Sequence, residues 1–254
     1  MAARVVAVIP ARWASTRLHG KMLADIQGKP LILRTLENTK RATILDDVIV
    51  ATDDNRIKTV IEANGGKAVL TDPDLPSGSD RVWAAIQHLD GDIIVNVQGD
   101  EPLLPEEVIT ESVQLLVDNP SFDATTAASP LKPDELANPN VVKVVTSKSG
   151  KALYFSRSIL PYPRGMEKNS DREKFLTENN QLFKRHIGIY VYRRETLGQF
   201  CKLPVGDLEA CEKLEQLRML ENDISIGVAN VVSNAVGVDT QEDLDRVRKQ
   251  YTTF

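Results

Sequence analysis

Apolar runs alternate with amphipathic segments along the first half of the chain. Runs without polar alternation, rich in valine and isoleucine, occupy residues 4–10, 46–53, 67–72 and 92–102. Segments with helical periodicity occupy residues 29–42, 55–66 and 77–89. Strands that lack polar alternation are typical of sheets with helices on both faces. The repeated strand–helix order up to about residue 118 therefore predicts an α/β fold with a parallel, doubly wound sheet.

The second half of the chain has strand patterns without long helices between them. These patterns lie at residues 125–131, 140–147, 151–160 and 185–193, and they predict an antiparallel or mixed extension. Residues 161–180 are polar and are predicted to form a mobile loop. A helix is predicted over 207–222, then a strand over 225–232, then a strand and a helix over 235–250.

Composition narrows the class of protein. The chain has 254 residues, enough for one large domain or one domain with a small subdomain. Its net charge of −5 argues against a nucleic-acid or anionic-membrane surface, which needs a basic footprint. Two cysteines, Cys201 and Cys211, form no disulfide framework. Because no apolar run has the length of a signal peptide or membrane span, we expect a cytoplasmic protein.

Three cations follow the first predicted strand. Arg12, Arg17 and Lys21 lie there together with Ser15. In open α/β sheets, ligands bind beyond the carboxyl ends of the strands, and cations, hydroxyls and loop amides suit a polyphosphate. The stretch matches neither the Walker nor the dinucleotide glycine pattern. A merely solvated basic loop is the alternative.

Two carboxylates are candidates for binding Mg²⁺. Asp100, followed by Glu101, comes directly after a buried strand, and Asp239 is expected at the end of another. Mg²⁺ takes oxygen ligands and usually bridges to substrate phosphates. Alternatively, Asp100 and Pro102 form a turn, and Asp239 or Thr240 caps the last helix.

The stretch SGSDR precedes a predicted helix. Ser77 and Asp80 have the spacing of a capping box, which predicts Ser77 as the helix cap. Gly78 would let a flat base approach the backbone closely, and Arg81 could reach a phosphate.

Other polar residues suit a sugar. In the strand at 185–193, a period of two puts His186, Gly188 and Tyr190 on one face, which leaves room for a polyhydroxylated ligand. An ordinary strand with one polar side is the alternative.

Three more candidates for binding the sugar lie outside that strand. Arg157 could bind a substrate carboxylate through two hydrogen bonds. Glu215 and Gln216 lie on the rim of an amphipathic helix, where most polar residues are simply solvated.

Taken together, these motifs resemble one family. The stretches are IPARWASTRLHGK, VNVQGDEP, YFSR, RHIGIYVYR, CEKLEQLR and GVDTQEDL, in this order. The set is similar to the CMP-Kdo synthetases (3-deoxy-manno-octulosonate cytidylyltransferases), essentially end to end. The resemblance implies a single nucleotidyltransferase domain over 1–254, with a Rossmann-like core of mostly parallel sheet at about 1–125 and 205–254. A smaller antiparallel extension at about 126–204 would bind the sugar and form a homodimer.

The resemblance also implies the reaction and the role of each residue. The reaction is CTP + Kdo → CMP-Kdo + diphosphate with Mg²⁺, which activates an acidic sugar for lipopolysaccharide. The implied catalytic residues are Arg12, Lys21, Asp100 and Asp239, and the implied metal ligands are Asp100 and Asp239. The nucleotide would be bound by Arg12, Ser15, Arg17, Lys21, Ser77, Gly78, Arg81 and Asp100. The sugar would be bound by Gln98, Arg157, His186, Tyr190, Glu215 and Gln216.

The chain departs from the family pattern at two places. RLHGK has His19 and then Met22 where the family has prolines, and SGSDR replaces an SGTER-like stretch. These changes leave room for another sugar, such as an amino derivative of Kdo. A CMP-sialic acid synthetase, a UTP- or GTP-using enzyme and a non-catalytic nucleotide-binding regulator are the alternative readings.

Overall fold

One nine-stranded sheet organises the residues that the computed structural model describes, which are 3–15, 17–166, 168–233, 235 and 237–251. Its strands are β1 (Val5–Ala11), β4 (Asp47–Thr52), β5 (Lys67–Leu70), β6 (Ile93–Asn96), β7 (Ala124–Pro130), β8 (Lys143–Thr146), β9 (Ala152–Ser156), β10 (Lys184–Arg193) and β11 (Ile226–Asn230). Two short strands, β2 (Asp25–Ile26) and β3 (Lys29–Pro30), pair separately.

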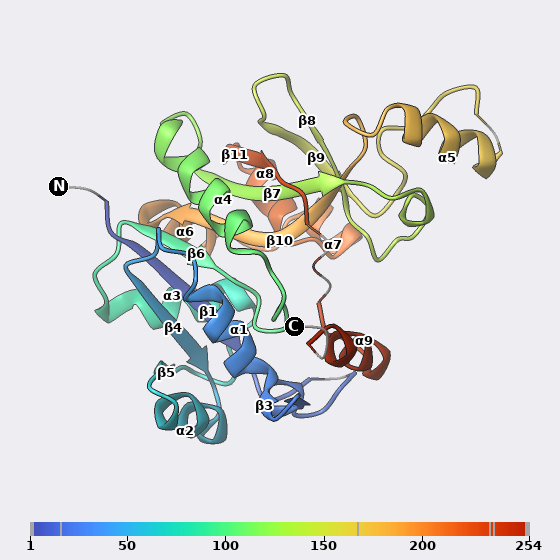
Figure 1. The fold of residues 1–254 in the computed structure, drawn as a ribbon. Helices are drawn as coiled ribbons and strands as arrows, with labels where there is room; N and C mark the ends of the chain where they lie inside the picture. The colour runs from blue at the N-terminus through green and yellow to red at the C-terminus, as the bar shows by residue number, and fades with distance from the viewer. Residues whose placement is uncertain (1–2, 16, 167, 234, 236, 252–254) are drawn as a thin grey trace.

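The main row of the sheet has the order β11–β7–β10–β6–β1–β4–β5 (Figure 1). β6, β1, β4 and β5 are parallel, and β7 and β11 are parallel to each other. β10 lies between β6 and β7 and is antiparallel to both. This mostly parallel α/β sheet confirms the predicted fold class.

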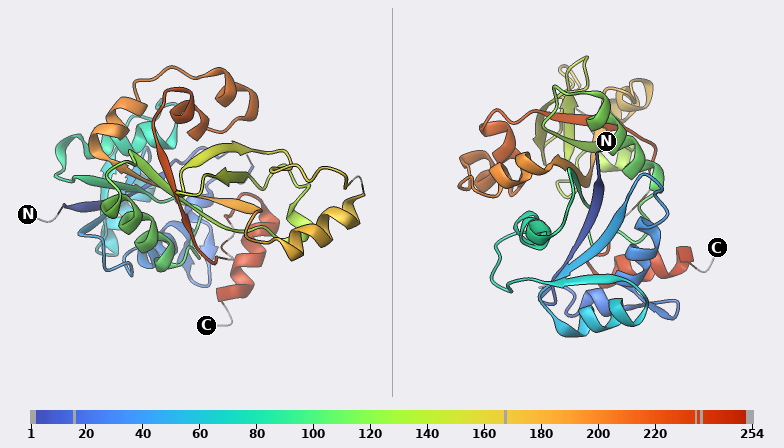
Figure 2. Two further views of the ribbon diagram at one scale, coloured as in Figure 1. Left: turned by 90° about the horizontal axis from the view of Figure 1, so that it is seen from above. Right: turned by 90° about the vertical axis from the view of Figure 1, so that its left-hand side faces the viewer.

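Helices cover both faces of the sheet. The α-helices of the described residues are α1 (Leu31–Thr39), α2 (Asn55–Ala63), α3 (Gly78–Ala85), α4 (Glu106–Asp118), α5 (Asn169–Glu178), α6 (Arg194–Phe200), α7 (Asp207–Glu212), α8 (Gln216–Glu221) and α9 (Gln241–Tyr251). The core on one face includes residues of α1, α2, α4 and α9, and the core on the other includes residues of α3, α6 and α8. α3 and α9 accordingly lie on opposite sides of the sheet (Figure 2).

β1 shows why these strands lack polar alternation. Val5, Ala7 and Ile9 pack into the core on one face, whereas Val6 and Val8 pack into the core on the other. A strand with helices on both sides is typically apolar at nearly every position. The predicted burial on two faces is thereby confirmed. No helix in the described part of the chain is long and apolar enough to cross a membrane.

β7 and β10 continue the main sheet across the predicted boundary near residue 125. The small antiparallel extension consists of β8 and β9, with α5 at its far end (Figure 1). The division into a core at 1–125 and 205–254 and an extension at 126–204 stays a prediction.

The loop predicted at 161–180 is wrong in part, because α5 lies within it. Leu176 and Phe183 form a small buried cluster with Leu131 and Leu136, and Phe175 packs against Phe183. Two adjacent apolar residues in a polar stretch give no visible helical period, although they suffice to anchor a short helix. Residue 167 of this stretch lies outside the described residues.

The single helix predicted over 207–222 is also wrong. It is broken into α7 and α8 at Lys213, which adopts a left-handed conformation with φ of 54°. The break leaves Glu215 at the beginning of α8 rather than on the side of a continuous helix.

The strand predicted at the start of 235–250 is likewise wrong. Residues 235 and 237–239 form a loop, and only the predicted helix, α9, is present. Residue 236 lies outside the described residues.

Candidate active site

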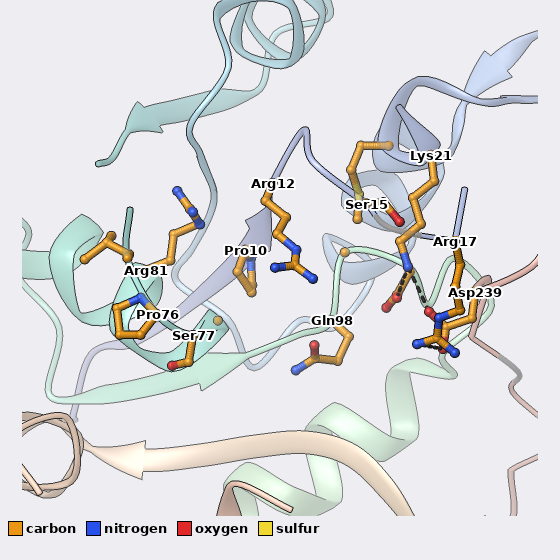
Figure 3. Close-up of a pocket in the computed structure, with 15 residues that line it drawn as sticks. Pro10, Arg12, Ser15, Arg17, Lys21, Pro76, Ser77, Arg81, Gln98 and Asp239 are labelled. Carbon is orange, nitrogen blue, oxygen red and sulfur yellow. Dashed lines mark hydrogen bonds and ion pairs between the residues drawn. The ribbon is translucent and has the colours of Figure 1, made fainter. Parts of the chain in front are cut away.

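The loops beyond the carboxyl ends of β1 and β6 border one cavity of about 320 Å³, within the usual range for ligand pockets. Ten residues proposed from the sequence line it: Arg12, Ser15, Arg17, Lys21, Ser77, Gly78, Arg81, Gln98, Asp100 and Asp239. They come from the loop after β1, the beginning of α3, the loop after β6 and the segment before α9 (Figure 3). The cavity therefore lies where open α/β sheets bind their ligands.

Lys21 lies at the centre of the charged end of this cavity. Its Nζ donates to Asp100 Oδ2 at 2.6 Å, to Asp239 Oδ1 at 3.1 Å and to the carbonyl oxygen of Val238 at 3.0 Å. Arg17 contacts the other oxygen of Asp239 at 3.3 Å (Figure 3). Three oxygens from two separate loops thus converge on one ammonium group.

Asp239 is free to face Lys21 because Thr240 caps α9 instead. The Thr240 hydroxyl accepts from the backbone N–H of Asp243 at 3.2 Å and donates to the Asp243 carboxylate at 2.8 Å. This contact decides between the two capping residues considered from the sequence. The backbone N–H of Val238 donates to the carbonyl oxygen of Asp100 at 2.9 Å, which holds the two carboxylate-bearing loops together.

The two carboxylates fit a divalent cation. They already surround the positive charge of Lys21, and with Val238 they offer only oxygen atoms, the ligand type that Mg²⁺ requires. Among the described residues no group of three or more histidine, cysteine or acidic side chains could hold a metal. A site of two carboxylates suits Mg²⁺, which completes its coordination with water and substrate phosphates.

Ser77 is the N-cap of α3, as predicted. Its hydroxyl accepts from the backbone N–H of Asp80 at 3.1 Å and donates to the Asp80 carboxylate at 2.7 Å. Gly78 follows as the first helical residue, and both residues line the cavity. The amino end of α3 therefore borders the cavity, and the amino end of a helix favours an anion.

Arg12 and Arg81 differ in how they are held. Arg12 is exposed, has no ion-pair partner among the described residues, and points into the middle of the cavity (Figure 3). Arg81 is 3% exposed, and its guanidinium contacts Thr71 at 2.5 Å and Asp53 at 3.4 Å. Arg12 is therefore the freer cation for a phosphate, whereas Arg81 also ties α3 to neighbouring loops.

Five of the six predicted sugar residues lie outside the lining of this cavity: Arg157, His186, Tyr190, Glu215 and Gln216. Two observations relate β10 and Glu215 to the neighbourhood of the cavity. A side-chain carbon added to Gly188 of β10 would lie 3.7 Å from Gln98 Cγ, and Ser79 of α3 donates to Glu215 at 3.3 Å. The polar face of β10 therefore borders the cavity.

Buried polar atoms without hydrogen-bond partners gather in this region. In the described part of the chain they are Asn96 Oδ1, Glu101 Oε2, Glu215 Oε1 and Gln216 Nε2. Burial, followed by the charges of Glu215 and Glu101, raises the pKa of Tyr190 well above its usual value, so its phenol stays neutral. Unpaired buried polar atoms are costly unless a ligand pairs with them. A polyhydroxylated ligand would supply both donors and acceptors.

Asn96 was not considered from the sequence. It is 2% exposed and pairs with Tyr190 across β6 and β10, so the two side chains share one face of the sheet. The available signal was an asparagine within the apolar run IIVNV, where an unpaired polar group is unfavourable.

Arg157 does not reach toward the cavity. Its guanidinium donates to the carbonyl oxygens of Glu212, Lys213 and Pro139 at 2.7, 3.3 and 3.0 Å. Two of these carbonyls are at the end of α7, where backbone acceptors lack helical partners. In this conformation Arg157 serves as a cap for α7, and carboxylate binding stays a prediction.

Replacing His186 with asparagine should make stability less dependent on pH in mild acid. Burial lowers the pKa of His186 to about 3, below its usual value of about 6.5. Between these two pH values the unfolded chain binds one more proton than the folded chain. The contribution of neutral His186 to the free energy of unfolding is therefore complete above about pH 6.5 and is lost as the pH falls. Because of His186, the free energy of unfolding should rise with pH in this range by up to about 1.4 kcal/mol per pH unit.

Urea unfolding from about pH 4 to about pH 7 measures this slope. The exposed His88, changed to asparagine in the same way, is the matched control. An unchanged slope in the His186 variant would contradict the assignment of a neutral, partly buried imidazole.

The chain is similar to several known proteins. A family model described as "Cytidylyltransferase" matches residues 6–226. A 3-deoxy-manno-octulosonate cytidylyltransferase of Chloroherpeton thalassium is 45% identical over 248 residues, which cover 96% of each chain. One of Bdellovibrio bacteriovorus is 46% identical over 247 residues, which cover 97% of each chain.

Solved structures match over the whole fold. A CMP:2-keto-3-deoxy-manno-octonic acid synthetase complexed with CTP aligns with a TM-score of 0.90 and 38% identity, covering 99% of each chain. A 4-diphosphocytidyl-2C-methyl-D-erythritol synthase from Anaerococcus prevotii aligns with a TM-score of 0.61 and 13% identity, which shows a shared fold alone.

Proposed function

This chain belongs to the cytidylyltransferase family, and we propose that its reaction is the transfer of a cytidylyl group from CTP to 3-deoxy-D-manno-octulosonate (Kdo), with release of diphosphate. The chain is thus a nucleotidyltransferase that activates Kdo for lipopolysaccharide biosynthesis. The observation that carries the proposal is the cavity lined by Arg12, Arg17 and Lys21 together with Asp100 and Asp239, in which Arg17 and Lys21 form ion pairs with these carboxylates.

The arrangement suits attack of a sugar hydroxyl on the α-phosphorus of CTP. Arg12 and Lys21, with Arg17 beside them, would stabilise the negative charge that increases on the phosphates as diphosphate leaves. Ser15 and the amino end of α3 at Ser77 and Gly78 would hold the rest of the nucleotide. Mg²⁺, bound by Asp100 and Asp239, would neutralise phosphate charge and make the attacking hydroxyl more acidic.

The sugar would lie over the polar face of β10. Gln98 lines the cavity, and Gly188 of β10 faces it, because a side-chain carbon added to Gly188 would lie 3.7 Å from Gln98 Cγ. Glu215 and Gln216 would also contact the sugar, since each has a buried polar atom that forms no hydrogen bond within the described part of the chain, although Glu215 Oε1 lies 3.7 Å from the Arg218 guanidinium. Asn96 and Glu101 would also contact the sugar, because each has a buried oxygen that forms no hydrogen bond with the described residues.

Location and assembly form part of the proposal. Cys201 and Cys211 are both free thiols, as is usual in a reducing compartment, and we place the reaction in the cytoplasm. A homodimer would cover exposed apolar side chains of the second half of the chain, among them Leu153, Tyr162 and Val232.

Diphosphate release, measured with Mg²⁺ for four nucleotides and three sugars, tests the function. The nucleotides are CTP, UTP, GTP and ATP, and the sugars are Kdo, its 8-amino analogue and sialic acid. We expect release only with CTP and an octulosonic acid, and the preferred sugar then identifies the substrate. Release with sialic acid or another nucleotide would indicate a different synthetase. Binding of CTP without any release would indicate a non-catalytic nucleotide-binding protein.

A further inference from the structure

Thr126 lies in the middle of β7, which neighbours β10 in the sheet, and its side chain is on the same face of the sheet as that of Tyr190. It is completely buried and pairs with Tyr190, at the point where the register of β7 and β10 shifts between Ile187 and Tyr190. The shift directs two carbonyl groups of β10 toward the threonine side chain. The Thr126 hydroxyl oxygen is 2.6 Å from the carbonyl oxygen of Ile189 and 3.2 Å from that of Ile187.

The same hydroxyl contacts His186 of β10, with 2.8 Å between its oxygen and Nε2. A hydroxyl has one proton to donate, and its oxygen can accept. Carbonyl oxygens only accept, and two oxygens 2.6 Å apart without a proton between them repel each other. The proton of Thr126 is therefore directed to Ile189, and the contact with His186 must be a hydrogen bond from Nε2–H to the Thr126 oxygen.

This network fixes the state of the imidazole. Nε2 carries a proton, and burial keeps the ring neutral, so Nδ1 carries none and is an acceptor. The ring is held edge-on to Phe155 and tilted against Tyr190, at centroid distances of 5.0 and 5.5 Å. Nδ1 has no hydrogen-bond partner among the described residues.

We propose that Thr126 is a positioning residue for sugar recognition, because it holds His186 in the Nε2–H form and so presents Nδ1 as an acceptor to the sugar. The inference rests on the proposed function. Its consequence is that the bound sugar must offer a donor, a hydroxyl or an amino group, to Nδ1. Thr126 then acts through His186 and does not touch the substrate.

Two substitutions at Thr126 and one at Thr125 test the proposal. Thr126→Val removes the hydroxyl at nearly constant shape, and Thr126→Ser retains it. Thr125→Val is the matched control, since Thr125 is also completely buried on β7 but donates to Ser112 on the other face of the sheet, at 2.6 Å.

The first readout is the nitrogen NMR spectrum of the histidine rings in the protein without substrates. The chain has only three histidines, so a variant lacking His186 identifies its signals. We expect the Nε2–H form in the wild type, in Thr126→Ser and in Thr125→Val, and its loss in Thr126→Val. The Nδ1–H form in the wild type would overturn the proposal, even if Thr126→Val failed to fold.

The second readout is the pair of KM values for diphosphate release. Thr126→Val should raise the KM for the sugar by about tenfold, which corresponds to one hydrogen bond, and leave the KM for CTP unchanged. Thr126→Ser and Thr125→Val should keep both constants close to wild type. A sugar KM unchanged in Thr126→Val, or raised as much in Thr125→Val, would overturn the proposal. Absence of release by the wild type would instead contradict the proposed function, and the NMR readout would still decide the tautomer.

Discussion

Replacement of Asp100 by asparagine is expected to lower the rate of diphosphate release by about a thousandfold, the upper range for loss of one electrostatic contact in an active site. Asparagine keeps the size of the side chain but carries no charge. The loop after β6 would then lose the carboxylate that lies 2.6 Å from Lys21 Nζ, and the predicted Mg²⁺ site would keep only Asp239. Release should be followed at saturating CTP and Kdo while Mg²⁺ is varied.

The control lies next to the same strand. Asp90 is exposed and precedes β6 at its amino end, so Asp90→Asn removes the same charge at the opposite edge of the sheet and should retain wild-type turnover. Asp239→Asn should resemble Asp100→Asn. If either site variant keeps near wild-type turnover at saturating Mg²⁺, the two carboxylates do not form the metal site.

The position of the cavity could be predicted from the sequence because it follows from the strand pattern. Apolar runs show where β1 and β6 end, and parallel strands bring their carboxyl ends to one edge. Residues just after those ends, such as Arg12, Lys21 and Asp100, must then lie close together. The structure places all three in the lining of one cavity.

Contacts between distant segments could not be predicted in this way. Asp239 lies in a loop, where no strand end determines its position, and the bond from Val238 to the Asp100 carbonyl brings it to Lys21. The same limit applies to Arg157, since no pattern indicates that its partners would be carbonyls at the end of α7. Thr126 was missed because buried threonines are common in strands, and only the register shift of β10 gives its hydroxyl three partners.

Replacement of Lys21 by methionine should have opposite effects on catalysis and on metal binding. Turnover should fall by about a hundredfold to a thousandfold, because the transition state loses a cation beside the phosphates. Mg²⁺ alone should bind the protein without nucleotide severalfold more tightly, because the ammonium group no longer competes for Asp100 and Asp239. Diphosphate release measures the first effect, and calorimetric titration with Mg²⁺ measures the second.

Lys29→Met is the matched control, because Lys29 also forms an ion pair, with Glu37 at 2.6 Å, but both side chains are about half exposed and lie outside the cavity. Neither turnover nor the affinity for Mg²⁺ should change in Lys29→Met, since exposed ion pairs contribute little to stability. A loss of turnover in Lys21→Met without tighter Mg²⁺ binding would show that Lys21 and the metal do not share the two carboxylates. Wild-type turnover in Lys21→Met would remove Lys21 from the catalytic residues, whatever its effect on the metal.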